Sequence, residues 1–297
     1  MLKHFVEAMS EEKHFASILR HQPIPPILTV DLNKPYCEKK RIKFAAESAR
    51  WVESRTKKGY GVHEPGLVQA LYVLRKLLGP QPDRAFYDVG SLHGYCALMA
   101  AAILDVGSSF AFEMNPVFTA GIRNNLSLND HLDTHLHVIN AGVSNKTRLQ
   151  VPCHYHGFAL RVEPDKETVA SLETEGFDNT NIDIITLDHF LALTGLAPSV
   201  VKIDVEGSQM SILKGATTLL KRFSPVLFIE SDNQSAVNHE GISMSEICEF
   251  LMTDFGYEIM AFNHRDWGFD VIYNSTINTD FGSINLEKNR LFACFPT

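Results

Sequence analysis

Short apolar runs and longer amphipathic stretches alternate through most of the chain. Runs of strand length stand at residues 85–89, 110–113, 136–140, 200–204 and 226–230. Stretches with apolar residues at helical spacing stand at 95–104, 117–126, 210–222 and 244–255. The repeated order of strand and helix predicts an α/β fold in which a doubly wound, mostly parallel sheet carries helices on both faces.

Residues 146–188 break this rhythm. Their apolar runs are short and alternate with polar positions, at 149–153, 159–162 and 182–186. This pattern predicts extra strands inserted after the third strand of the sheet, instead of a crossover helix.

The first 58 residues contain no strand-then-helix unit. Apolar residues at helical spacing predict one helix in residues 2–19, which a cluster of prolines ends, and a second in 37–58. We therefore predict a helical extension over residues 1–58, packed on the main domain or on a second copy of the chain. A membrane-surface helix is the alternative for the first helix, but its polar face is mixed and not basic. The main domain is expected over residues 59–297, and His63-Glu64-Pro65 opens its first helix, since proline suits the first turn.

Charge and composition narrow the classes of protein. The formal net charge of −8 argues against nucleic acid as the main partner, because phosphate binding needs a basic surface. No apolar run reaches membrane-spanning length, and glutamates interrupt the apolar residues at the N-terminus, so we expect neither a membrane span nor a secretory leader. Five cysteines stand far apart without a C-x-x-C pair, as is typical of reduced thiols. We therefore expect a soluble, cytoplasmic protein.

The strongest candidate for a ligand site is a glycine turn within residues 86–95. A buried strand leads into the turn, Gly90 and Gly94 stand in it, and an apolar helix follows. Glycine allows a sharp bend and a close approach to a ligand, and the helix N-terminus aims free N–H groups at the same place. Such a unit is typical of a nucleotide-type pocket.

The residues around this turn favour one such ligand. The G-x-G-x-x-G spacing of dinucleotide folds is absent, and Asp88 ends the strand with a carboxylate that would repel a pyrophosphate. S-adenosylmethionine has a positive sulfonium and no phosphate, so Asp88 favours this cofactor over NAD. Glu113, which ends the second strand, could accept hydrogen bonds from both ribose hydroxyls. Asn140-Ala141, after the third strand, could meet the adenine edge or form an ordinary turn.

A second polar cluster ends a central strand at residues 200–207. Lys202, Asp204 and Glu206 stand there, at the edge where open α/β sheets bind ligands.

Together these motifs resemble the FkbM family of methyltransferases, over residues 59–295 and in the family's order. The motifs are Asp88-Val89-Gly90 with Gly94-Tyr95, Phe112-Glu113 with Asn115-Pro116, Asn124, Asn125 and Asn129, Thr186-Leu187-Asp188, the run 201–207, Gly215-Ala216 and Ile229-Glu230. Two places depart from the family pattern. Leu92-His93 replaces the usual Asn and Ile, and Gln209 replaces a second glutamate.

The resemblance implies the class I S-adenosylmethionine-dependent fold, with seven strands of which the last is antiparallel. It also implies an O-methyltransferase acting on a hydroxyl of a sugar, glycan or secondary metabolite. The expected cofactor-binding residues are Asp88, Gly90, Ser91, Gly94, Tyr95, Glu113, Met114, Asn140, Ala141 and Asp204.

Lys202, Asp204 and Glu206 are the candidate catalytic residues. Methyl transfer to an alcohol needs alignment, exclusion of water and a base that takes the hydroxyl proton. We expect Asp204, ahead of Glu206, to be this base, with Lys202 fixing their charge. The structural alternative is that Lys202 and Glu206 pair and cap the next helix. Residues 154–161 and the loop from His264 to Trp267 are expected to shape the acceptor pocket.

Two other functions stay open. An amine acceptor needs less help from a base, so N-methylation is an alternative to O-methylation. The other alternative is a non-catalytic protein of the same fold that binds a partner through its N-terminal helices.

Two His-x-His pairs are candidate metal ligands, and they are His135/His137 and His154/His156. The rings of each pair point to one side if the pair lies on a strand. No third ligand stands at a convincing spacing, so we expect no metal.

Overall fold

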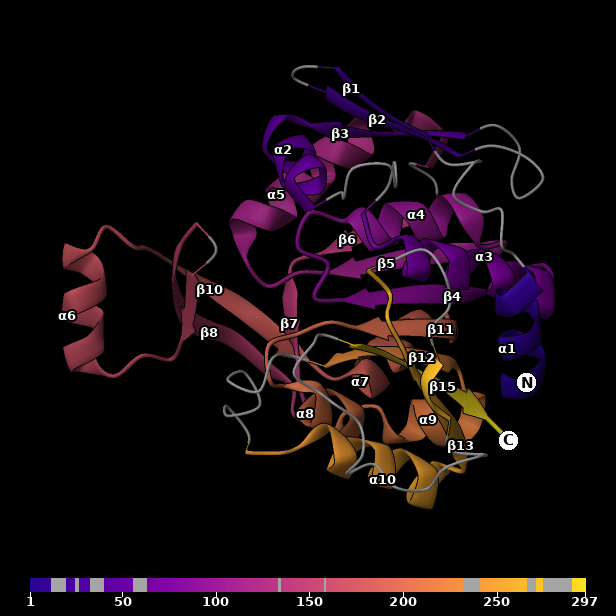
Figure 1. Cartoon of the computed structure of the whole chain (residues 1–297). Coiled ribbons are helices and arrows are strands. Elements are labelled where there is room, and N and C mark those ends of the chain that lie inside the picture. Colours follow the sequence, from indigo (N-terminus) through magenta and orange to yellow (C-terminus); the bar gives the residue numbers. More distant parts are fainter. Residues whose placement is uncertain are drawn as a thin grey trace.

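The computed structural model describes residues 1–11, 20–24, 27–32, 40–55, 63–132, 135–157, 159–231, 241–265, 271–274 and 290–297. Its main element is an eight-stranded sheet with the order β14-β13-β15-β12-β11-β4-β5-β6 (Figure 1). These strands are β4 (Gln81–Val89), β5 (Val106–Phe112), β6 (Leu136–Ile139), β11 (Pro198–Ile203), β12 (Val226–Ser231), β13 (Tyr257–Phe262), β14 (Val271–Asn274) and β15 (Arg290–Pro296).

Strand direction in this sheet follows the prediction. The neighbours from β12 through β11, β4 and β5 to β6 are parallel. β15 is antiparallel to both β12 and β13, so it alone is reversed among the seven strands from β13 to β6. The seven-stranded, mostly parallel sheet with an antiparallel last strand is therefore confirmed. β14 adds an eighth strand, paired antiparallel with β13 at the edge.

Helices cover both faces of the sheet. On one face pack α3 (Pro65–Leu78), α4 (Tyr95–Ile103) and α5 (Pro116–Ser127), which a short 3₁₀ turn, η2 (Asp130–Leu132), follows. On the other face pack α7 (Leu187–Thr194), α8 (Gln209–Lys214), α9 (Thr217–Phe223) and α10 (Met244–Phe255). Consecutive residues of β4 enter different cores: Phe86 joins the first and Tyr87 the second, both fully buried. Burial on both faces explains why this strand reads as a continuous apolar run.

The insertion after β6 forms a second sheet. Its elements are β7 (Ala141–Val143), β8 (Arg148–His156), β9 (Ala159–Val162), α6 (Lys166–Thr174) and β10 (Asp178–Ile185), with the strand order β7-β10-β8-β9. This arm projects from the main body, with α6 at its far end (Figure 1). The inserted strands are confirmed, whereas α6 has no counterpart in the prediction.

The N-terminal extension is not purely helical, which corrects the prediction. It contains α1 (Leu2–Glu11), the antiparallel strands β1 (Arg20–Ile24), β2 (Ile27–Leu32) and β3 (Lys40–Ala45), and α2 (Ala46–Arg55). The single helix expected over residues 37–58 was wrong for Lys40–Ala45. Ile42 and Phe44 are fully buried there while Arg41 and Lys43 are exposed, which is the two-residue period of a strand. The expected boundary at residue 58 lies outside the described residues.

The extension shares the hydrophobic core of the main domain. Leu2, Phe5 and Phe44 are fully buried in the cluster that also holds α3 and α4. The rings of Phe5 and Phe295 lie 4.8 Å apart, so α1 packs against the last strand of the sheet. The apolar face of α1 is therefore used within the same chain. Among the described helices, none is long and apolar enough to cross a membrane.

Candidate active site

Gly90 and Gly94 form a tight turn between β4 and α4. Both have positive φ, at 83° and 75°. A Cβ on Gly90 would lie 1.9 Å from the carbonyl oxygen of Asp204, and one on Gly94 would lie 2.8 Å from Ile122 Cγ2. Only glycine meets both demands, because left-handed backbone and missing space coincide. The turn after β4 therefore packs directly on the chain leaving β11, which joins the two polar motifs predicted separately.

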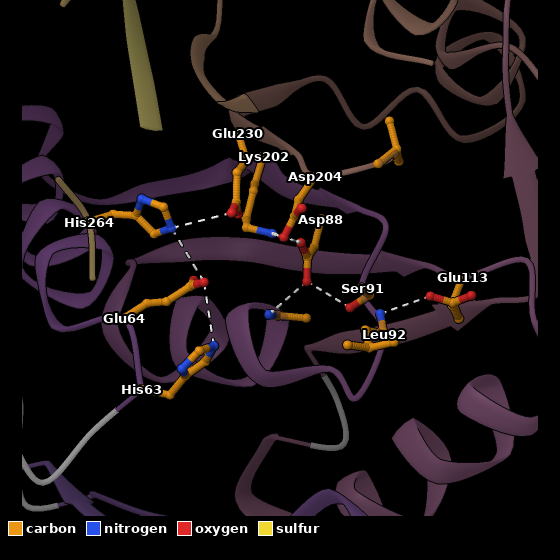
Figure 2. Close-up of polar contacts among 12 residues, drawn as sticks. His63, Glu64, Asp88, Ser91, Leu92, Glu113, Lys202, Asp204, Glu230 and His264 are labelled. Atoms are coloured by element: carbon orange, nitrogen blue, oxygen red, sulfur yellow. Dashed lines mark hydrogen bonds and ion pairs between the residues drawn. The ribbon is translucent and has the colours of Figure 1, made fainter. Parts of the chain in front are cut away.

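The side chain of Asp88 stabilises this turn. It is completely buried, and its Oδ2 accepts hydrogen bonds from Ser91 Oγ at 2.7 Å and from the backbone N–H of Ala97 at 3.0 Å (Figure 2). The second bond caps the first turn of α4, for which Gly94 supplies no side chain. From the sequence, Asp88 is expected to face a ligand. In the structure its carboxylate instead faces the turn, α4 and Lys202.

Glu113 lies at the carboxyl end of β5, beside the turn. Its two oxygens accept hydrogen bonds from the backbone N–H groups of Leu92 and Asn115, each at 2.8 Å. Burial raises the pKa of Glu113 to about 7, although both N–H groups oppose this shift. The Asn140 amide donates to the carbonyl oxygens of Glu113 and Met114, at 3.0 and 3.1 Å. Asn140 thus fixes the loop after β5, which is a structural role for the residue predicted to meet adenine.

Lys202 and Asp204 form an ion pair at the end of β11. Lys202 Nζ lies 2.7 Å from Asp204 Oδ2 and 3.8 Å from Asp88 Oδ1. Burial alone would lower the pKa of Lys202, but Asp204 and Asp88 raise it well above its ordinary value. The Asp204 side chain is 35% exposed, against 4% for Lys202. Burial raises the pKa of Asp204 to about 7, an effect that Lys202 opposes and Glu230 reinforces.

Glu206 does not take part in this pairing. It is exposed, and the recorded ion pairs of Lys202 go to Asp88 and Asp204, so the predicted alternative of a Lys202–Glu206 pair is wrong. Gln209, which departs from the family pattern, donates through Nε2 to the carbonyl oxygens of Val205 at 2.7 Å and of Glu230 at 3.2 Å. It therefore ties the loop after β11 to β12.

His93 attaches the glycine turn to the N-terminal extension. Its Nδ1 lies 3.2 Å from Ser48 Oγ on α2, and its ring lies 5.1 Å from that of Trp51 on the same helix. Burial lowers the pKa of His93 to about 4, so the ring is neutral at pH 7. The backbone carbonyl of His93 accepts from Asn125, whose Oδ1 accepts from the N–H of Ala45. His93, which departs from the family pattern, thus packs against the N-terminal extension, and this extension lies outside the family resemblance.

A second buried cluster was not predicted. His264 Nε2 lies 3.5 Å from both Glu64 Oε1 and Glu230 Oε1, and His63 Nε2 lies 3.4 Å from Glu64 Oε1 (Figure 2). Arg265 donates to Glu230 Oε1 at 2.9 Å. Burial would raise the pKa of Glu64, but His63 and His264 hold it well below its ordinary value. Burial would likewise lower the pKa of His264, but Glu64 and Glu230 raise it to about 9.

Each member of this cluster carried a separate signal in the sequence. Glu64 precedes the proline that opens a helix, Glu230 belongs to a family motif, and His264 begins a loop expected to border the acceptor. Nothing in their spacing indicated that they meet, because they follow different elements of the fold.

The regions expected at the acceptor pocket are only partly described. The turn between β8 and β9 reaches the loop after β5, since Asn115 Nδ2 donates to the carbonyl oxygen of Gly157 at 2.9 Å. Trp267 lies outside the described residues. Among the described residues, the one group that brings three metal-ligating side chains together is Glu64, Glu230 and His264, and it includes neither His-x-His pair.

The order of the sheet, its reversed β15 and the polar groups at the ends of β4, β5 and β11 define the fold of class I methyltransferases. Residues 88–259, more than half of the chain, match the family described as the methyltransferase FkbM domain. The chain therefore belongs to the FkbM methyltransferase family. No curated protein matches its sequence.

Solved structures similar to this chain share little sequence with it. The FkbM methyltransferase from Methylobacillus flagellatus KT is 14% identical with a TM-score of 0.45, and the match covers 84% of this chain and 58% of that one. This chain thus spans less than two thirds of that protein. The precorrin-6y C5,15-methyltransferase from Geobacter metallireducens GS-15 is 16% identical with a TM-score of 0.39, covering 77% and 88%. The O-methyltransferase from Bacillus cereus in complex with S-adenosylhomocysteine is 13% identical with a TM-score of 0.41, covering 78% and 80%.

Proposed function

We propose that the chain transfers a methyl group from S-adenosylmethionine to a hydroxyl of a sugar, glycan or secondary metabolite. The observation that carries the proposal is the packing of the Gly90 turn on Asp204. It puts the predicted cofactor turn and the predicted base side by side. S-adenosylmethionine supplies an electrophilic methyl group on its sulfonium sulfur.

The chain's residues fit such a cofactor. Glu113 already orders the turn through two backbone N–H groups, and its oxygens have further lone pairs that can accept from ribose hydroxyls. Gly90 and Gly94 let the turn pack tightly against Asp204 and Ile122, which holds its backbone beside the end of β11. Ser91 lies in this turn and Tyr95 follows it, whereas Met114 follows Glu113 and Ala141 follows Asn140. These four residues complete the proposed cofactor site.

Asp204 is the proposed base. A base works best when its pKa lies near the working pH, and Asp204, raised to about 7, meets this condition. Lys202 holds one carboxylate oxygen at 2.7 Å and thereby fixes the orientation of the carboxylate. Asp204 is also the more exposed partner of that pair, so an acceptor hydroxyl can reach it. Glu206, although exposed, has no such fixed position.

Labelled methyl transfer tests the proposal. The protein is incubated with S-adenosylmethionine carrying a ¹³C-methyl group and with fractionated small molecules and glycans of the source cells. The expected product shows an O–CH₃ signal by NMR, and Asp204→Asn lowers its rate at least about 100-fold, in line with the loss of a general base. Asp254→Asn on the exposed end of α10 is the matched control and should leave the rate unchanged.

Three results would count against the proposal. An N–CH₃ product would show that the acceptor is an amine and not a hydroxyl. Near-normal turnover by Asp204→Asn would show that Asp204 is not the base. No transfer to any fraction, together with cofactor binding, would favour the non-catalytic alternative.

A further inference from the structure

Glu64, Glu230 and His264 converge from three distant parts of the chain. Glu64 precedes α3, Glu230 lies near the end of β12, and His264 follows β13. The ligand-type atoms of the three side chains lie within 4.8 Å of one another. All three residues are buried, with 8%, 4% and 0% of their surface exposed. Figure 2 shows both carboxylates turned toward the same nitrogen of His264.

The spacing of these atoms is wide for direct hydrogen bonds. His264 Nε2 lies 3.5 Å from an oxygen of each glutamate. Charge-assisted N–H···O bonds are about 2.7–2.9 Å long. Ligand atoms at about 2.0–2.2 Å from a tetrahedral metal ion lie about 3.4 Å apart. The two distances at His264 Nε2 therefore match neighbouring ligands of one ion better than tight charge-assisted hydrogen bonds, and the two glutamate oxygens lie within 4.8 Å of each other.

Charge in this region also leaves room for a cation. The carboxylates linked through the recorded ion pairs of Lys202, Arg265 and His264 are Asp88, Asp204, Glu64 and Glu230. Among the described residues, Lys202 and Arg265 are its permanent cations, and His264 adds a positive charge when no ion is bound, since, against the effect of burial, Glu64 and Glu230 raise its pKa to about 9. A divalent cation that displaces the proton of His264 would take over the compensation of these two carboxylates.

We propose that Glu64, Glu230 and His264 form a binding site for one divalent cation of the Mn²⁺ or Zn²⁺ class. Two carboxylate oxygens with one imidazole nitrogen suit these ions, whereas Mg²⁺ favours an all-oxygen set. His63, 3.4 Å from Glu64 Oε1, and Arg265, 2.9 Å from Glu230 Oε1, then act as outer partners that orient the two carboxylates. Arg265 Nε also donates to His264 Nε2 at 3.4 Å, a contact that the ion would replace. Three protein ligands leave at least one position for water or for an acceptor oxygen.

The site is separate from the His-x-His pairs and does not depend on methyl transfer. Glu230 lies on β12, the direct neighbour of β11, so the ion would stand beside the strand end that carries Asp204. The competing occupant of the cluster is a proton on His264, which would make the three residues a plain ion-pair network.

Metal titration of the chelator-treated full chain, without cofactor, tests the site. Mn²⁺ is followed by electron paramagnetic resonance, and Zn²⁺ by competition with a chromophoric chelator. We expect one ion per chain, with weaker Mg²⁺ binding. Glu64→Gln and His264→Gln should each weaken Mn²⁺ binding more than about tenfold. The controls Glu249→Gln and His189→Gln make the same changes at exposed positions on α10 and α7 and should bind as the unchanged chain does.

Metal binding by the unchanged chain tests the proposal even if a cluster variant fails to fold. Absence of saturable Mn²⁺ and Zn²⁺ binding by this chain would overturn the proposal, as would equal affinity in well-folded cluster variants. A rise in the thermal midpoint of the unchanged chain on adding Zn²⁺, absent from Glu64→Gln, would support it. Since no cofactor is present, failure of the metal site and failure of methyl transfer are distinguishable.

Discussion

The ion pair between Lys202 and Asp88 connects the glycine turn after β4 to the central strand β11, so Lys202→Met should weaken the whole fold. The two side chains are 4% and 0% exposed. Replacing the lysine with an apolar residue of similar length leaves Asp88 buried, with only Ser91 and the Ala97 N–H as partners. Removing one member of a buried pair costs about 3–5 kcal/mol. The shorter contact to Asp204 contributes less of this, since Asp204 is more exposed than Asp88, at 35% against 0%.

Urea unfolding of single and double variants measures this effect. The expected loss in the free energy of unfolding is about 3–5 kcal/mol for Lys202→Met. Asp88→Asn removes the stranded charge, so the double variant should be more stable than the sum of the single losses by about 1–3 kcal/mol. Lys214→Met, at an exposed position on α8, is the control and should change stability by less than about 0.5 kcal/mol. A loss below about 1 kcal/mol for Lys202→Met, with no coupling to Asp88, would show that this ion pair does not stabilise the fold.

Three further variants test other parts of the site. Gly90→Ala should lower the free energy of unfolding by about 2 kcal/mol or more and weaken the binding of S-adenosylhomocysteine. Gly195→Ala is the control, because Gly195 has φ 69° but nothing within 4 Å of the added Cβ, so it should lose only the backbone strain energy. Equal losses of stability in thermal unfolding would contradict this. Calorimetry should show that cofactor affinity falls about tenfold per pH unit below the pKa of Glu113, which is about 7, because the protonated carboxyl accepts fewer hydrogen bonds. In Glu113→Gln the affinity should depend less on pH. An affinity of the unchanged chain that does not vary with pH would contradict this role of Glu113. Asp188→Ala should lower the free energy of unfolding in urea by about 1–2 kcal/mol, because Asp188 accepts hydrogen bonds from two backbone N–H groups at the start of α9. Cofactor affinity should not change. A change in affinity without a loss of stability would disprove this structural role.

The sheet was predictable because its strands are buried on both sides. Phe86 and Tyr87 pack into different cores, so β4 appears in the sequence as an unbroken apolar run between turn residues. β3 was missed because Phe44 and Ala45 extend the helical spacing of Ala49 and Val52 in α2. Short segments with both periods are ambiguous, and tertiary packing decides between them.

The site was predictable as a set of positions but not as contacts. Gly90 and Asp204 both stood in recognisable motifs, and the parallel sheet brings the ends of β4 and β11 together. The direction of the Asp88 side chain could not be inferred, because it depends on α4 and Lys202 filling the space beneath the turn. The cluster of Glu64, Glu230 and His264 was missed for a related reason, since residues far apart in the chain meet only through the complete topology.

Calorimetry with S-adenosylhomocysteine tests the proposed binding of S-adenosylmethionine at the Gly90 turn. We expect one molecule to bind per chain with saturation, Gly90→Ala to weaken this binding, and NAD to give no heat. Absence of saturable binding of S-adenosylhomocysteine, or saturable binding of NAD in its place, would show that the turn does not hold this cofactor.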